Sequence, residues 1–191
     1  MLELAKSTDT VNGLVSKQTG VANAVKGGGV FTVQCYDKDG NLKWEDKSPN
    51  LVVNVGLQDM NTKYFTGSGY TATWFIGLYG SGSTNNPAAG DTAASHAGWT
   101  EVTAYSEATR PAATFGTATT ADPSVISNVL NKAEFNITGT TTVGGAFLIS
   151  NSTKSGTTGI LFSASDFTGG DRSVVNGDIL NVTYQFSLDA A

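Results

Sequence analysis

The residues with the most obvious capacity for chemistry are one histidine, His96, and one cysteine, Cys35. A Ser-His-Asp triad requires a base beside a nucleophile and held by a third group, and the residues around His96 single out no such partners. We therefore expect His96 to be a loop histidine that hydrogen-bonds locally. Cys35 alternates with Phe31 and Val33, which predicts a small buried apolar residue rather than a reactive thiol.

Metal-binding patterns are equally sparse. A zinc site requires several Cys or His ligands, and the chain has one of each. Asp37-Lys-Asp39-Gly-Asn41 resembles the opening of a calcium loop, but Ser48 occupies the twelfth position, where such loops carry a bidentate Glu. A hairpin turn accounts for the same residues. We therefore expect no catalytic residue, no metal and no cofactor, and we expect that the protein is not an enzyme.

Five aromatic residues could form a platform on which sugar rings stack. In a β-sandwich, however, aromatic residues at alternating strand positions usually belong to the core. We expect a core role, and keep a ligand platform and a subunit interface as alternatives, for Trp44, Trp74, Tyr79, Trp99 and Tyr105.

Composition and charge narrow the function classes. The net charge is −5 and no run of Lys or Arg exists, which argues against a protein that binds nucleic acid. No stretch approaches the roughly 20 apolar residues of a membrane span. The first residues, 1–6, lack the basic and apolar regions of a signal peptide, so we expect synthesis in a cytoplasm.

From Val30 onward the sequence alternates between apolar and polar residues. Segments rich in Val, Ile, Thr and aromatics recur about every ten residues, separated by turns, which predicts an all-β fold. We expect an antiparallel two-sheet sandwich, jelly-roll or immunoglobulin-like, with a central strand in 143–150. One short helix is predicted over 56–65, where Leu57, Met60 and Tyr64 fall on one face.

Residues 1–29 differ from the rest and are predicted to form a flexible N-terminal arm, followed by the sandwich domain at 30–191. The arm ends in Gly27-Gly28-Gly29, which we interpret as a flexible joint. It is either disordered or becomes ordered against a neighbouring subunit. In the second case its apolar residues would form the interface: Leu2, Leu4, Val11, Leu14, Val15, Val21 and Val25.

Several stretches between residues 30 and 187 resemble a family of structural proteins of tailed bacteriophages, the head decoration or cement type. They are YDKDGNLKW (36–44), NLVVNVGL (50–57), FIGLY (75–79), DT (91–92), HAGWTE (96–101), Tyr105, RP (110–111), TVGGAFL (142–148) and GDILNVTY (177–184). The resemblance implies a virion protein on the capsid surface, with the major capsid protein as partner. It brings no catalytic residue.

Three hypotheses about function follow. The first is a decoration or cement protein that stabilises the phage head by bridging capsid subunits. We expect it to be a homo-oligomer, a trimer or a dimer, because both suit the symmetry axes of a capsid. The second is a tail or head fibre module that binds a host surface glycan. The third is a hydrolase of surface polysaccharide, which would require a pair of carboxylates such as Glu101 and Glu107.

Overall fold

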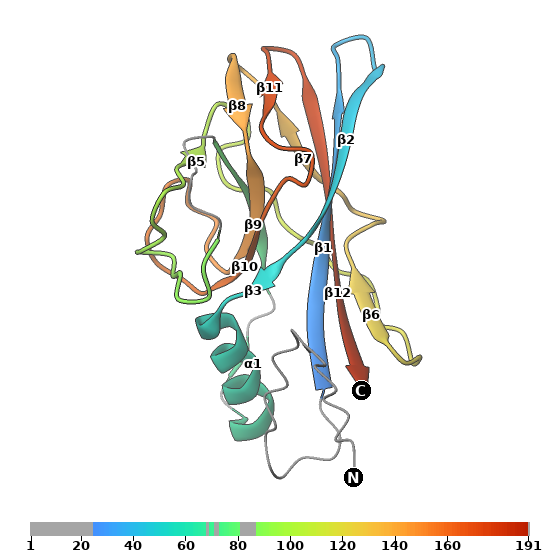
Figure 1. Cartoon of the computed structure of the whole chain (residues 1–191), viewed down its shortest axis with the longest axis vertical. Helices are drawn as coiled ribbons and strands as arrows, with labels where there is room; N and C mark the ends of the chain where they lie inside the picture. Colours follow the sequence, from blue (N-terminus) through green and yellow to red (C-terminus); the bar gives the residue numbers. More distant parts are fainter. Residues whose placement is uncertain (1–24, 68, 71–72, 81–86, 191) are drawn as a thin grey trace, which may run out of the picture.

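The computed structural model describes residues 25–67, 69–70, 73–80 and 87–190. This part of the chain forms one helix and twelve strands (Figure 1). In chain order they are β1 (Val25–Tyr36), β2 (Leu42–Pro49), β3 (Leu51–Val52), α1 (Asn54–Thr66), β4 (Phe75–Tyr79), β5 (Glu101–Val102), β6 (Ser124–Ser127), β7 (Ala133–Asn136), β8 (Thr141–Val143), β9 (Gly145–Ile149), β10 (Leu161–Asp166), β11 (Arg172–Val174) and β12 (Ile179–Ala190).

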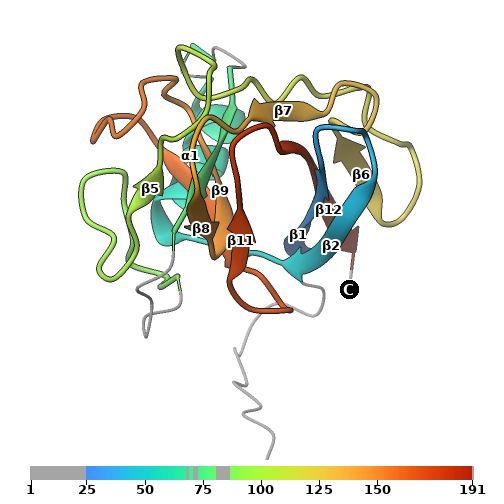
Figure 2. The same cartoon turned by 90° about the horizontal axis from the view of Figure 1, so that it is seen from above.

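The strands form two main layers that face each other, as the view from above shows (Figure 2). In the first sheet the order is β2-β1-β12, and both β6 and β7 pair with the far edge of β12. In the second sheet the order is β3-β10-β9-β4-β5, and β8 pairs with β11 as a separate ribbon. All these pairings are antiparallel, so the predicted all-β, two-sheet fold with one short helix is confirmed. The jelly-roll and immunoglobulin-like topologies stay predictions.

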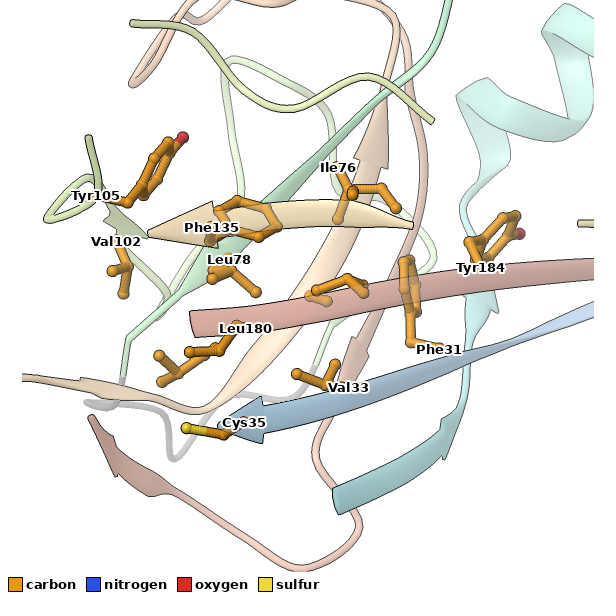
Figure 3. Close-up of a cluster of buried hydrophobic side chains, with 14 of the residues drawn as sticks. Phe31, Val33, Cys35, Ile76, Leu78, Val102, Tyr105, Phe135, Leu180 and Tyr184 are labelled. Atoms are coloured by element: carbon orange, nitrogen blue, oxygen red, sulfur yellow. The ribbon is translucent and has the colours of Figure 1, made fainter. Parts of the chain in front are cut away.

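The main core lies between the two sheets and follows from the alternation of each strand. Phe31, Val33 and Cys35 of β1 point inward and are completely buried. They meet the inward residues of β4 and β12, and the close-up shows these side chains gathered between the ribbons (Figure 3). Burial of large apolar side chains of this kind contributes about 1.5–3 kcal/mol each, so this cluster holds the two sheets together.

The second sheet is covered on both faces. All five residues of β9 are buried, which confirms the central strand predicted in 143–150. Phe147 and Ile149 of β9 point away from the first sheet, into a second cluster that also contains Trp99 from a loop and Val53 at the start of α1. Residues 87–100, which belong to the segment between β4 and β5, therefore help to cover this face of the sheet, which explains why a strand without polar alternation occurs here.

The glycine run at 27–29 is not a joint, and that interpretation of the sequence is wrong. Gly27, Gly28 and Gly29 lie within β1 and pair with Leu188, Ser187 and Phe186 of β12. A Cβ atom on Gly29 would lie 2.7 Å from the hydroxyl oxygen of Tyr184, so the missing side chain makes room for an aromatic ring. Gly29 is thus required by neighbours more than 150 residues away in the sequence, whereas nothing lies within 4 Å of the Cβ position of Gly28.

Strand β1 also begins before residue 30, where the sandwich domain was predicted to start. Val25, assigned to the arm on sequence grounds, is the first residue of β1 and is 71% exposed. The remaining residues of the predicted arm interface lie outside the described residues: Leu2, Leu4, Val11, Leu14, Val15 and Val21.

The same packing of a ring over a glycine occurs twice in the second sheet. Gly77 of β4 pairs with Phe147 of β9, and Tyr79 pairs with Gly145. A Cβ on either glycine would overlap the aromatic ring of its partner. A Cβ on Gly145 would also overlap the Ser165 carbonyl oxygen, a close backbone approach of the kind that a glycine inside a strand indicates.

Helix α1 spans Asn54–Thr66 and ends at Gly67, whose φ of 64° only glycine adopts without strain. Its existence was predicted, but the face marked by Leu57, Met60 and Tyr64 is not buried as a unit. Met60 packs against the core, whereas Leu57 is 46% and Tyr64 is 83% exposed. The reason is that the helix approaches β10 through Gly56, where a Cβ would lie 2.5 Å from the Phe162 carbonyl oxygen.

Two neighbouring glycines of β1 allow a matched test. Gly29→Ala should lower the free energy of unfolding by about 1–3 kcal/mol, because the new methyl group collides with Tyr184 and the Gln185 carbonyl. Gly28→Ala should change it by less than about 0.5 kcal/mol, because nothing lies within 4 Å of its Cβ position. Urea unfolding of both variants checks this, and equal losses would contradict a specific ring contact at Gly29.

Candidate functional site

His96 lies over the indole of Trp99 and does not face a nucleophile. The two rings stack with centroids 3.9 Å apart, and Nδ1 of His96 lies 3.1 Å from the Trp99 carbonyl oxygen. Trp99 is 5% exposed and its Nε1 donates to Asp91. The predicted local hydrogen bond of His96 is therefore confirmed, and its ring covers the second hydrophobic cluster.

Glu101 and Arg110 form a buried, bidentate ion pair. Nε and Nη2 of Arg110 each donate to a different Glu101 carboxylate oxygen at 2.8 Å, and the two side chains are 2% and 5% exposed. Nη1 donates to the Asn151 carbonyl, and the Ser155 backbone N–H donates to Glu101. The pair thus ties the loop that follows β9 to β5 and contributes geometric specificity as well as energy.

A cavity of about 300 Å³ lies beside this ion pair, lined by His96, Trp99, Glu101 and Arg110 among others. Each of the three guanidinium nitrogens of Arg110 already donates to a protein oxygen. Both oxygens of Glu101 already accept. The charged groups of the cavity are therefore engaged in holding the fold, which argues against their use in ligand binding.

Glu107, the second carboxylate considered for a catalytic pair, is also held by hydrogen bonds within the fold. It accepts hydrogen bonds from the backbone N–H and from Nδ2 of Asn136, the latter at 2.7 Å. Burial disfavours the charged form, but these bonds and those from Ser106 and the Glu107 backbone outweigh it and lower the pKa of Glu107. Within the described residues, no three His, Cys, Asp or Glu side chains are grouped so as to hold a metal ion.

The Asp37–Asn41 segment is a hairpin turn between β1 and β2, as predicted. Oδ1 of Asp37 accepts from the backbone N–H groups of Asp39 and Asn41 at 2.9 and 2.8 Å. The hydrogen bonds from Asn41 lower the pKa of the Asp37 carboxyl. Gly40 takes a φ of 82°, the left-handed conformation that such a turn requires.

The aromatic residues weighed as a sugar platform belong to the core, which confirms the expectation. Tyr79, Trp99 and Tyr105 are at most 5% exposed. Trp44 and Trp74 are half-buried and pack against the main core. Their rings are occupied by contacts within the domain.

Exposed apolar side chains are the feature that the sequence did not reveal. Leu57, Tyr64 and Phe65 of α1 are 46%, 83% and 77% exposed, and we call them the helix surface. They recur at i, i+7 and i+8, so they fall on one side of the helix. The rings of Tyr64 and Phe65 contact each other edge to face, with centroids 5.0 Å apart. An exposed pair of aromatic rings of this kind is typical of a contact site.

A second exposed pair, Val129 and Leu130, lies in the turn between β6 and β7, and we call it the loop surface. Leu130 is 88% exposed, more than any other large apolar residue of the described chain. The turn is held by the buried Asn128, which accepts from the Tyr184 N–H at 2.6 Å and donates to the Val182 carbonyl. The loop surface is therefore presented on a well-anchored turn of the first sheet, whereas α1 packs on β10 of the second.

No protein-family model, no curated protein and no solved structure matches this chain. In the part of the chain that the structure describes, no helix is long and apolar enough to cross a membrane.

Removing the negative charge of the buried ion pair should be costly. Glu101→Gln leaves the Arg110 guanidinium buried without its counter-charge, which should lower the free energy of unfolding by about 3–5 kcal/mol. Lys38→Ala breaks the exposed Lys38–Asp39 pair and should have no measurable effect. Chemical unfolding at neutral pH measures both, and similar small losses would mean that the buried pair does not stabilise the fold.

Cys35 should not react with thiol reagents in the folded protein. Its side chain is completely buried, and burial, with the nearby Asp178 charge, raises the thiol pKa to about 12. Ellman's reagent should therefore modify Cys35 only after unfolding, whereas a Leu130→Cys variant should react at once at its exposed thiol. Rapid modification of the folded wild-type protein would show that the core around Cys35 opens readily.

Proposed function

We propose that this protein is a virion structural protein of the capsid decoration or cement type. It binds the major capsid protein on the outer surface of a phage head and stabilises the head by bridging subunits. The single observation that carries the proposal is the pair of exposed apolar surfaces, one attached to each sheet. A protein that bridges subunits has to contact more than one neighbour, and two separate apolar surfaces would provide two such contacts.

The state of the reactive groups supports a binding role over a catalytic one. His96 stacks on Trp99, Glu101 is paired with Arg110, and Glu107 is bound to Asn136. Each of these contacts stabilises the fold. The net charge of −5 further disfavours direct binding to the packaged nucleic acid.

The proposed mechanism is the addition of many weak contacts. Each copy buries a modest apolar area on the capsid, and the symmetry of the head repeats that contact around every axis. A subunit held at two points leaves more slowly than one held at one point, because the second contact forms at a high effective concentration. We assign the loop surface to the capsid, since Leu130 stands on an anchored turn and can dock without rearrangement.

The assignment of the loop surface can be tested on purified expanded heads. Leu130→Ser should weaken binding roughly tenfold, or about 1.4 kcal/mol, because the most exposed apolar side chain is lost. The neighbouring exposed change Asn131→Ser should not weaken it. Co-sedimentation with heads, with bound copies counted per particle, measures the effect.

The wild-type copy number distinguishes the hypotheses. Many copies per head that saturate at a ratio set by capsid symmetry support decoration. Only a few copies, or binding to tails and not to heads, would overturn it in favour of a fibre module. Glycan binding by tail-bound protein would identify that module.

A further inference from the structure

We propose that the helix surface is the docking site for the N-terminal segment, residues 1–24, of a neighbouring copy of this chain. The inference goes beyond the proposed function, because it concerns a contact between copies and does not require the capsid. Three features favour this segment as the binding partner of the helix surface: the place where the described chain begins, the length of the segment, and its composition.

The described chain begins at the end of the β1–β12 ladder, which β6 flanks on the β12 side as far as Leu188. The ladder between β1 and β12 continues to the pair Val25–Ala190, whereas the pairing of β1 with β2 stops at Val30. The β1–β12 ladder thus extends five residues, or roughly 17 Å, beyond the end of β2. Val25 is 71% exposed, so the described chain begins at the edge of the domain and not within its core.

The helix surface lies at the same end of the molecule as the start of β1. In Figure 1 the C-terminal half of α1 and the start of β1 both lie at the lower end of the molecule. Copies that share a symmetry axis near this end would bring the start of one β1 close to the α1 of another. A segment of 24 residues has a maximum reach of roughly 80 Å, which is ample for that transfer.

The composition of the segment is suited to an apolar docking site. Its larger apolar residues are Leu2, Leu4, Val11, Leu14, Val15 and Val21. Val11, Leu14 and Val15 recur at i, i+3 and i+4, so a single side of the segment could present all three to Tyr64 and Phe65. Two acidic residues, Glu3 and Asp9, balance two basic ones, Lys6 and Lys17, so no net charge opposes the contact.

We expect the aromatic side chains of the helix surface to contribute most of its affinity for the segment. Tyr64 and Phe65 bring large rigid rings, already in contact with each other, so little side-chain freedom is lost on docking. Their exposure in the single chain means that most of their surface is available for burial. Exchange of a terminal segment between identical copies is also a simple route to a closed oligomer.

Mixing two full-length cysteine variants tests the contact between copies directly. Leu14→Cys in one preparation and Phe65→Cys in the other should form a mixed disulfide-linked dimer on mild oxidation, since the buried Cys35 of each chain does not compete. Leu14→Cys mixed with Leu130→Cys is the matched control, because Leu130 is equally accessible but lies on the other surface. That control should cross-link much more slowly.

Two results would overturn the proposal. One is that Leu14→Cys cross-links to Phe65→Cys and to Leu130→Cys at equal rates. The other is a double variant, Leu14→Cys with Phe65→Cys, that closes only within single chains while the mixed pair does not cross-link.

Self-association gives an independent readout. The joint change Tyr64→Ala with Phe65→Ala should weaken oligomerisation roughly tenfold in analytical ultracentrifugation, whereas Gln58→Ala on the same helix should not. A wild-type protein that stays monomeric at all concentrations would overturn the proposal. All these experiments are done without heads, so their outcome is separate from that of the decoration hypothesis.

Discussion

The pairing of β1 with β12 is the interaction on which the rest of the structure depends. Twelve residues near the start of the described chain, Val25–Tyr36, pair one for one with twelve at its end, Ile179–Ala190. Strands β2, β6 and β7 are added to this ladder, and its inward side chains form half of the main core. Because β1 and β12 are so distant in sequence, the centre of the first sheet cannot form until β12 is present, which makes this part of the fold highly non-local.

Close contact between aromatic rings and glycines is the second constraint, and it acts in both sheets. Tyr184 crosses Gly29 in the first sheet, while Phe147 and Tyr79 lie over Gly77 and Gly145 in the second. A ring that lies flat on a neighbouring strand fills space that a smaller side chain would leave empty. Tyr184 also receives hydrogen bonds from Asn50 and Ser163 at its hydroxyl, so one side chain joins β12 to β10.

The polar and charged groups that might have supported chemistry are used to hold loops. The Glu101–Arg110 pair fixes the loop after β9, Asn128 anchors the turn before β7, and Asp37 closes the first hairpin. Loops held this tightly present their exposed side chains in defined positions. A side chain that is already held in place loses little freedom on binding, and for this reason Leu130, on the turn that Asn128 anchors, fits the proposed role in assembly.

Features that depend on near neighbours could be predicted from the sequence. Alternation predicted the strands and the burial of Cys35, the Asp37–Asn41 pattern predicted a hairpin, and helical spacing predicted α1. Features that depend on distant partners could not be predicted in this way. The glycine run suggested a joint because its sequence does not show that Phe186 lies beside Gly27 and Tyr184 beside Gly29. In the same way, the sequence does not show that Arg110 pairs with Glu101. Exposure of Leu130 is likewise a property of packing, because local pattern records that a residue is apolar but not whether any other element covers it.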